Sequence, residues 1–284
     1  MKKAGSLEAK NRKAGLLFVS PWVIGFFLFT AYPLLYSFYL SFQQVKITTT
    51  GIQTKFVRFE NYEYAFAVDA QFVEKLLTYI RELVISTPII LVFALIIALL
   101  LNQKVKIRGF FRTLFFLPVI ITSGPVIREL INQGATTIPS IEKYAIYEAL
   151  SENPEGLMNG VLLYLIENLV VILWFSGVQI LIFLASLQKM DSSTYEAAKI
   201  DGASPWEIFW KITLPSLWPM VMMNLIYTVV TFSVFSLNKV IGHIQDHMFR
   251  VETGYGYASA LSWIYFLVIA LVLALSAGFM SLRI

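Results

Sequence analysis

The side chains most able to do chemistry are few. The sequence has two histidines, His243 and His247, and no cysteine. Their i, i+4 spacing places both imidazoles on one face of a helix, where they could share a metal ion. No third ligand at a recognisable spacing accompanies them, so we do not expect a metal site. The lack of cysteine excludes disulfides, thiolate nucleophiles and cysteine metal centres.

Other catalytic patterns are also absent from the sequence. We find no paired carboxylates, no Ser/His/Asp set and no metal cluster positioned for a reaction. The net charge of +4 comes mostly from lysine and arginine beside apolar segments, so it does not indicate nucleic acid as a partner. The sequence therefore favours a protein that is not itself an enzyme.

The elements that carry these residues are membrane helices. Of the 284 residues, 57% are apolar and only 14% are charged, whereas about 25% are charged in a soluble domain. Apolar stretches of about 20 residues, enough to cross a bilayer, recur along the chain. The sequence predicts an all-α, polytopic membrane protein with six transmembrane helices, at about 16–42, 82–102, 110–132, 160–187, 216–237 and 258–282.

Basic residues set the expected orientation. The first span is preceded by Lys2, Lys3, Lys10, Arg12 and Lys13, and the short loop 103–112 is also basic. The positive-inside rule then places both termini and this loop in the cytoplasm, with the chain in the cytoplasmic membrane among lipids. We expect residues 1–15 to be a cytoplasmic basic N-terminus and residues 16–284 to be one transmembrane domain. The segment 56–76 predicts a short amphipathic element at the outer surface.

Polar side chains inside the spans are candidates for a solute path. The third span is interrupted by Pro118 and by Gly124–Pro125, and such breaks are common where a translocation route passes. Hydrogen bonds to a solute could come from Asn168, Gln179, Asn224, Ser233 and Asn238. The alternative is that these side chains bond neighbouring helices, which contributes about 0.6 kcal/mol on average.

The segment 188–215 predicts two short helices in the cytoplasm. Ser193 and Ser204 are each followed three residues later by glutamate, Glu196 and Glu207, which is the pattern of a capping box. Gly202 falls where the first helix must end, and Pro215 is expected to stop the second. Trp206, Phe209 and Trp210 share one face, which could be covered by the chain's own membrane helices or by a groove on a cytoplasmic partner.

This segment resembles the permeases of bacterial ABC importers. Glu196-Ala197-Ala198, three residues, Gly202, nine residues, and Ile212-Thr213-Leu214-Pro215 match the EAA motif of that family. The surrounding "FLASLQKMDSSTYEAAKIDGASPWEIFWKITLPSLWP" is similar to the maltose-type sugar-importer branch, with its MetI-like transmembrane domain. So are "LLFVSPWVIGFFLFTAYPLLYSFYLSF", "GFFRTLFFLP" and "YGYASALSWIYF".

The resemblance implies a cytoplasmic coupling helix between the fourth and fifth spans, docked on an ATPase subunit. The implied contact residues are Glu196, Ala197, Ala198, Asp201, Gly202 and Trp206. It also implies a second, homologous permease chain, two ATP-binding cassette subunits and an extracytoplasmic solute-binding protein. The sequence has no G-x-x-x-x-G-K-[ST] loop, so ATP and Mg²⁺ would bind to the ATPase partner and this chain would carry no cofactor.

The expected function is half of a translocation pathway for a carbohydrate, and we expect that carbohydrate to be an oligosaccharide. The alternative is a secondary transporter driven by an ion gradient, which would need carboxylates buried in the spans. The sugar could be acidic, because Arg128 and Lys239 lie near the outer ends of the third and fifth spans and guanidinium binds carboxylate in a bidentate manner. The opposing interpretation is that Arg128 pairs with Glu129 or reaches the headgroups, and that Lys239 is an ordinary interfacial lysine.

Overall fold

Membrane-length helices dominate the chain. The computed structural model describes residues 2–48, 51–103, 109, 113, 129, 145–151, 157–235 and 238–281. Among these residues, five helices are long and apolar enough to cross a membrane: Lys13–Leu40, Ala70–Asn102, Val171–Lys189, Pro205–Ser233 and Gly254–Gly278. They correspond to the predicted first, second, fourth, fifth and sixth spans. The predicted third span, 110–132, lies outside the described residues except for positions 113 and 129.

Contacts within the chain divide it into two compact units. The first contains residues 1–74 and 242–267, and the second contains residues 75–241 and 268–284. The prediction of a single domain over 16–284 stays a prediction. Each unit is described by itself below.

The first unit begins with a long helix that has a π turn in its middle. Its elements are α1 (Lys2–Phe26), the π-helix η1 (Phe27–Ala31), α2 (Tyr32–Leu40), β1 (Gln43–Thr48), β2 (Gly51–Phe56) and α3 (Glu60–Ala67). The first turn of α4 (Ala70–Asn102), most of α13 (Lys239–Met248) and the first half of α14 (Gly254–Ser281) complete it.

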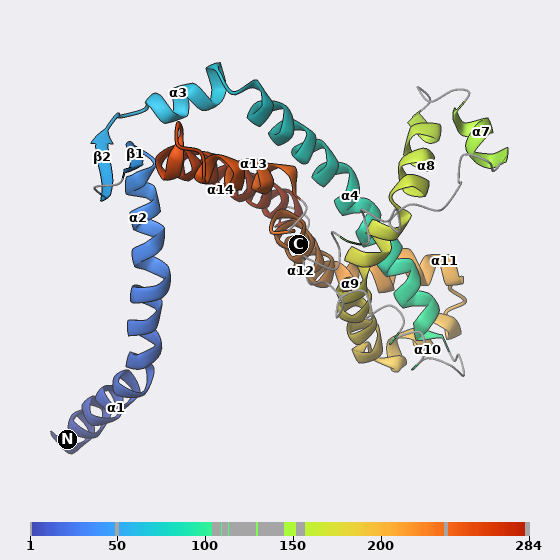
Figure 1. Cartoon of the computed structure of the whole chain (residues 1–284). Helices are drawn as coiled ribbons and strands as arrows, with labels where there is room; N and C mark the ends of the chain where they lie inside the picture. The colour runs from blue at the N-terminus through green and yellow to red at the C-terminus, as the bar shows by residue number, and fades with distance from the viewer. Residues whose placement is uncertain are drawn as a thin grey trace. The chain divides into compact units, whose positions relative to one another are not determined.

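A β-hairpin follows directly on α2 (Figure 1). Strands β1 and β2 pair antiparallel, with Gln43 opposite Phe56 and Thr48 opposite Gly51. The prediction of an amphipathic element over 56–76 is wrong in its bounds, because residue 56 ends β2 and a helix starts only at Glu60. Within these bounds the chain forms α3 and the start of α4, and the hairpin before them was not predicted.

Side chains of α2, α3 and α14 hold the hairpin in place. The amide of Asn61 donates to the carbonyl oxygens of Ser41 (2.8 Å) and Gln43 (3.0 Å). The indole of Trp263 on α14 donates to Ser37 Oγ at 3.2 Å, and its ring packs edge-on against Phe38. At Gly256 the backbone oxygen of Gln43 occupies the space that a Cβ atom would need, so α14 and β1 are in backbone contact.

The second unit is a helical bundle. It contains the rest of α4, then α7 (Ala145–Ser151), α8 (Leu157–Glu167), α9 (Leu169–Lys189), α10 (Ser192–Ile200) and α11 (Pro205–Ile208), followed by the π-helix η3 (Phe209–Thr213) and α12 (Leu214–Ser233). The predicted fourth span, 160–187, is broken at Asn168 into α8 and α9. One apolar cluster joins α4, α9 and α12 through Leu91, Ala98, Phe183, Leu184 and Leu217.

Both π turns end two residues before a proline. Tyr32 N–H bonds to Phe27 O ahead of Pro33, and Leu214 N–H bonds to Phe209 O ahead of Pro215. A proline ring collides with the carbonyl four residues earlier, and widening the preceding turn relieves that collision. The expectation that Pro215 ends a short helix is therefore wrong, because the helix continues from Pro205 to Ser233.

Candidate functional site

The segment between α9 and α12 forms a short helix, a tight turn and a second helical start. Asp191 caps α10 and accepts from the backbone N–H of Ser193 at 3.0 Å. That hydrogen bond holds the pKa of the Asp191 carboxyl below its usual value. The predicted capping box at Ser193 and Glu196 is therefore wrong, because the helix starts two residues earlier and a carboxylate already satisfies its first donors.

The second half of this segment matches the prediction. Ser204 caps α11 in a reciprocal capping box, with Ser204 N–H donating to Glu207 Oε2 at 3.0 Å and Glu207 N–H donating to Ser204 Oγ at 3.3 Å. Gly202 has a φ of +81°, which ends α10 in the left-handed region that glycine tolerates. The hydroxyl of Tyr195 lies 3.1 Å from Thr213 Oγ1, so α10 is fixed against η3.

The residues expected at the ATPase contact lie on the surface of this segment. Glu196, Ala197, Asp201, Gly202 and Trp206 are exposed, and Ala198 is half-buried. The side chain of Ile200 is 86% exposed, which is unusual for an isoleucine at the end of an ordered helix. This exposed surface, formed by α10, the turn at Gly202 and α11, is called the loop surface below.

An aromatic pair extends the loop surface. Trp206 is 70% exposed and Trp210 is 49% exposed, with ring centroids 5.5 Å apart. The described helices of the chain therefore do not cover this face. The sequence left two alternatives for this aromatic face: burial against the chain's own membrane helices, or binding in a groove on a cytoplasmic partner. The exposed fractions of Trp206 and Trp210 do not support the first.

The second unit also contains a cavity of about 360 Å³ with a mostly apolar lining and several polar groups. Its walls carry aromatic rings, including Tyr79, Tyr164 and Phe232, together with ionisable side chains. The ionisable residues at the wall are Lys75, Glu82 and Lys239. An aromatic wall with a few polar groups is the usual make-up of a small-molecule site.

Three of the predicted path residues, Asn168, Asn238 and Lys239, line this cavity. Ser233 lies behind the wall and shares a hydrogen bond of 2.6 Å with the hydroxyl of Tyr79. Sequence reasoning missed Lys75 and Tyr79, which lie on the part of α4 that precedes the predicted second span, and Glu82, which is the first residue of that span. Arg128 lies outside the described residues.

Gln179 and Asn224 form a separate buried pair between α9 and α12. Gln179 Nε2 donates to Thr228 Oγ1 at 2.9 Å, and Asn224 Nδ2 donates to the carbonyl of Gln179 at 3.4 Å. These bonds join neighbouring helices, as in the alternative to solute binding that the sequence left open for these two side chains. Within the described part of the chain, however, Gln179 Oε1 and Asn224 Oδ1 are buried without a hydrogen-bond partner.

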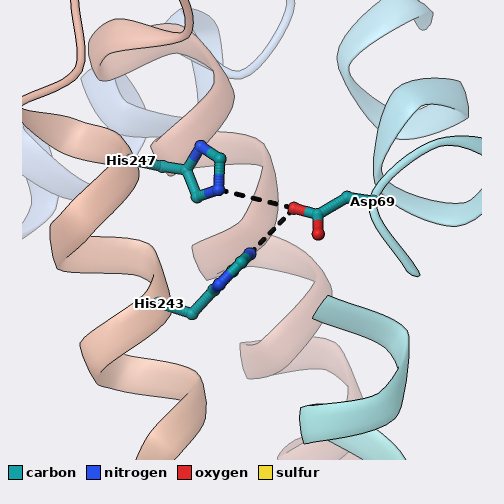
Figure 2. A group of neighbouring side chains, drawn as sticks. All are labelled: Asp69, His243 and His247. Carbon is teal, nitrogen blue, oxygen red and sulfur yellow. Dashed lines mark hydrogen bonds and ion pairs between the residues drawn. The ribbon is translucent and has the colours of Figure 1, made fainter. Parts of the chain in front are cut away.

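A third group of side chains lies in the first unit, at one end of α14. Figure 2 shows His243 and His247 pointing from one helix, α13, at the same carboxylate oxygen of Asp69. The distances from Asp69 Oδ2 are 2.8 Å to His243 Nε2 and 3.6 Å to His247 Nε2. Tyr257 O–H also donates to this oxygen, at 2.8 Å, and the backbone N–H of Phe72 donates to Oδ1 at 3.0 Å.

This group is buried, and burial and hydrogen bonding act on its ionisation in opposite directions. Burial alone would raise the pKa of Asp69, but the bonds from His243, Tyr257 and Phe72 outweigh it and the pKa is lowered. Burial lowers the pKa of His247, and the neighbouring His243 and Arg250 lower it further. The sequence showed the histidine pair but not Asp69, which precedes it by 174 positions.

The chain combines membrane-length helices, a cavity with aromatic and polar walls, and an exposed helical loop, which are features expected of a transport permease. Residues 164–283 match the family of binding-protein-dependent transport system inner membrane components. The chain is 31% identical to the probable ABC transporter permease protein YesP of Bacillus subtilis, over 96% of this chain and 91% of that protein. It therefore belongs to the ABC transporter permeases, and it is a multi-pass membrane protein.

Other relatives carry the names of sugars. The chain is 28% identical to the lactose transport system permease protein LacF of Rhizobium radiobacter, over 91% of each chain. It is 30% identical to the arabinooligosaccharides transport system permease protein AraP of Bacillus subtilis, over 78% of this chain and 69% of that one. Its fold matches a chain in a crystal structure of a bacterial alginate ABC transporter in complex with an alginate pentasaccharide-bound periplasmic protein. That match has a TM-score of 0.66 and 19% identity, over 95% of this chain and 94% of that chain. The family decides against the ion-gradient transporter considered from the sequence.

Proposed function

We propose that the chain is one of two permease subunits in an ATP-driven importer and forms half of the path for a carbohydrate. The sugar names of its relatives support this substrate class. The cavity supports it as well, because aromatic rings can pack on the C–H faces of a sugar while amides and hydroxyls bond its oxygens. The length of the sugar is proposed to be that of an oligosaccharide.

The exposed loop surface is the observation that carries the ATP-driven part of the proposal. The short capped helix α10 leaves Glu196, Ala197 and Ile200 exposed, and an exposed helix of this kind suits a groove on a second protein. That protein would be the ATPase subunit, which would hold ATP and Mg²⁺. The remaining partners are a second permease chain, a second ATPase subunit and an extracytoplasmic solute-binding protein. The family's name supports the last of these.

The proposed orientation follows from the basic flanks. Both termini and the loop surface lie in the cytoplasm, where ATP is available, while the hairpin and α13 lie on the extracytoplasmic side. The carboxylate, histidine and tyrosine group around Asp69 then faces the side on which a solute-binding protein would dock.

The proposal is tested by reconstituting the chain with its partner permease, ATPase and binding protein, and measuring ATP hydrolysis across a panel of oligosaccharides. We expect stimulation by at least one sugar only when the binding protein is present. Stimulation by amino acids or ions but by no sugar would contradict the substrate class. Hydrolysis that never responds to any solute would contradict the importer itself.

The same panel addresses the charge of the sugar. Lys75 and Lys239 at the cavity wall, with Glu82 as a counter-charge, leave an excess of one positive charge there, which favours an acidic sugar. Uptake by Lys239→Gln and by Arg128→Gln is compared for a charged and a neutral oligosaccharide of equal length. Loss of the charged substrate alone supports a uronate-type ligand, and equal loss of both contradicts it.

A further inference from the structure

Asp69, His243 and His247 form a converging set of metal-type ligands that the transport path does not use. Each offers one ligand atom, and all of these atoms lie within 4.8 Å of one another. The side chains are 8%, 4% and 7% exposed, respectively. The set joins the residue just before α4 to two consecutive turns of α13 (Figure 2).

Hydrogen bonds fix which nitrogen of His247 carries a lone pair. Thr253 Oγ1 donates its only hydrogen to the carbonyl of His247 at 3.0 Å. The same oxygen lies 3.1 Å from His247 Nδ1, and with its hydrogen on the carbonyl it can only accept there, so we assign the Nδ1–H tautomer to His247. In the neutral ring the lone pair then belongs to Nε2, the atom that faces Asp69.

In this tautomer two hydrogen-bond acceptors, His247 Nε2 and Asp69 Oδ2, face each other. The Nε2 lone pair of His247 lies 3.6 Å from Asp69 Oδ2, an oxygen that already has Tyr257 and His243 within 2.8 Å. Two buried acceptors that face each other repel, unless a positive centre lies between them. A cation bound by both atoms removes the conflict.

The spacing suits a small tetrahedral ion. Zinc bonds of about 2.0–2.1 Å place tetrahedral ligands about 3.3 Å apart. The two separations from Asp69 Oδ2, 2.8 Å and 3.6 Å, lie on either side of that length. Two imidazoles with one carboxylate suit zinc and similar transition ions, whereas calcium and magnesium prefer oxygen ligands alone.

We propose that Asp69, His243 and His247 bind a zinc ion, which displaces the proton on His243 Nε2 that bonds Asp69 in the metal-free chain, with a water molecule in the fourth position. Outer contacts orient the ligands as in known zinc sites: Thr253 orients His247, and Tyr257 O–H and Phe72 N–H orient the carboxylate. The ion joins the start of α4 to α13, and through Tyr257 to α14. Its role is therefore structural, within the first unit.

The experiment uses the full-length chain in detergent, purified without a histidine tag. Because His243 and His247 are its only histidines and it has no cysteine, imidazole-bound metal reports this site alone. Zinc is measured by mass spectrometry after dialysis, and Co²⁺ is used as a coloured substitute. We expect about one zinc per chain, intense Co²⁺ bands of a four-coordinate centre, and a lower Tm after chelation.

Matched variants separate ligands from their surroundings. Asp69→Asn and His247→Ala should lose the Co²⁺ bands and the effect of the chelator. Tyr257→Phe keeps all three ligands and should keep the bands, with metal affinity reduced by about 10–100-fold. Native chain that shows no Co²⁺ band and no change of Tm with chelator overturns the site, whether or not the variants fold. Equal bands in His247→Ala and in the native chain also overturn it.

Discussion

Gly256 marks the closest approach of two backbones in the first unit. A Cβ atom at this position would overlap the carbonyl oxygen of Gln43 and would lie 3.3 Å from the carbonyl oxygen of Leu40. Both neighbours are backbone atoms, so they cannot rotate away as a flexible side chain could. The residue therefore sets how closely α14 packs against the end of α2 and β1.

Gly256→Ala should destabilise the protein by about 1–3 kcal/mol, the usual cost of overpacking. We expect a Tm lower by several degrees in a thermal unfolding assay of the detergent-purified chain. Gly242→Ala is the matched control, because this glycine lies inside α13 and a Cβ there meets nothing within 4 Å. An alanine there favours the helix, so its Tm should be unchanged or higher. A Tm unchanged by Gly256→Ala would contradict the close packing.

Single residues were predictable from the sequence where their role is local. Gly202 and the Ser204–Glu207 box depend on neighbours within four positions, and both predictions are confirmed. The group around Asp69 depends on a contact across 174 positions, which no local pattern contains. The cavity residues Asn168, Asn238 and Lys239 were found because they are polar in apolar surroundings, and the same signal also selected the interhelical pair Gln179 and Asn224.

Among the elements, α10 is the one whose order matters most to the proposed coupling. It has nine residues and is fixed at its start by Asp191 and at its end by the turn at Gly202. So short a helix has little stability of its own. A small change in its interior should therefore alter the loop surface without disturbing the membrane helices.

Ala198→Pro should break α10, because proline in a helix interior costs about 3 kcal/mol. We expect normal membrane insertion, with loss of ATPase-subunit attachment in a pull-down and loss of transport. Ser192→Pro is the matched control, since it places proline at the first position of the same helix, after an extended Asp191. Full transport by Ala198→Pro would exclude α10 as the coupling element, and equal damage from both variants would show that the loop rejects any proline.

Element boundaries were harder to predict than element types. Hydropathy located the apolar runs, but it did not show that the helix continues through Pro215 by means of a π turn. The capping box was predicted at Ser193, but the carboxylate of Asp191, two residues earlier, caps α10. The hairpin at Gln43–Phe56 was missed because its outer strand is entirely exposed and shows no apolar face.

At the scale of the whole chain, membrane-length helices were the easiest feature to predict. Five of the six expected spans match helices of sufficient length and apolarity, because about 20 apolar residues in a row have few other uses. The grouping of the chain into two units was not predictable. The first unit combines residues 1–74 with residues 242–267, and hydropathy carries no information about such pairing.

The orientation of the chain is tested with single cysteines, for which the native sequence offers a clean background. Ser192→Cys lies at the exposed start of α10 and should react with impermeant thiol reagents only from the cytoplasmic side. Ser151→Cys lies at the exposed end of α7 and should react only from outside. Labelling of Ser192→Cys from outside in intact cells would overturn the arrangement with both termini in the cytoplasm.

The split composition of the first unit also has a consequence for biosynthesis. Asp69 leaves the ribosome 174 residues before His243, and at about 5–20 residues per second that interval lasts roughly 9–35 s. During this time the hairpin and the start of α4 exist without the helices that complete their packing. The unit must therefore assemble after most of the chain has been inserted, and a nascent chain interrupted before residue 242 leaves its first 74 residues without their partners.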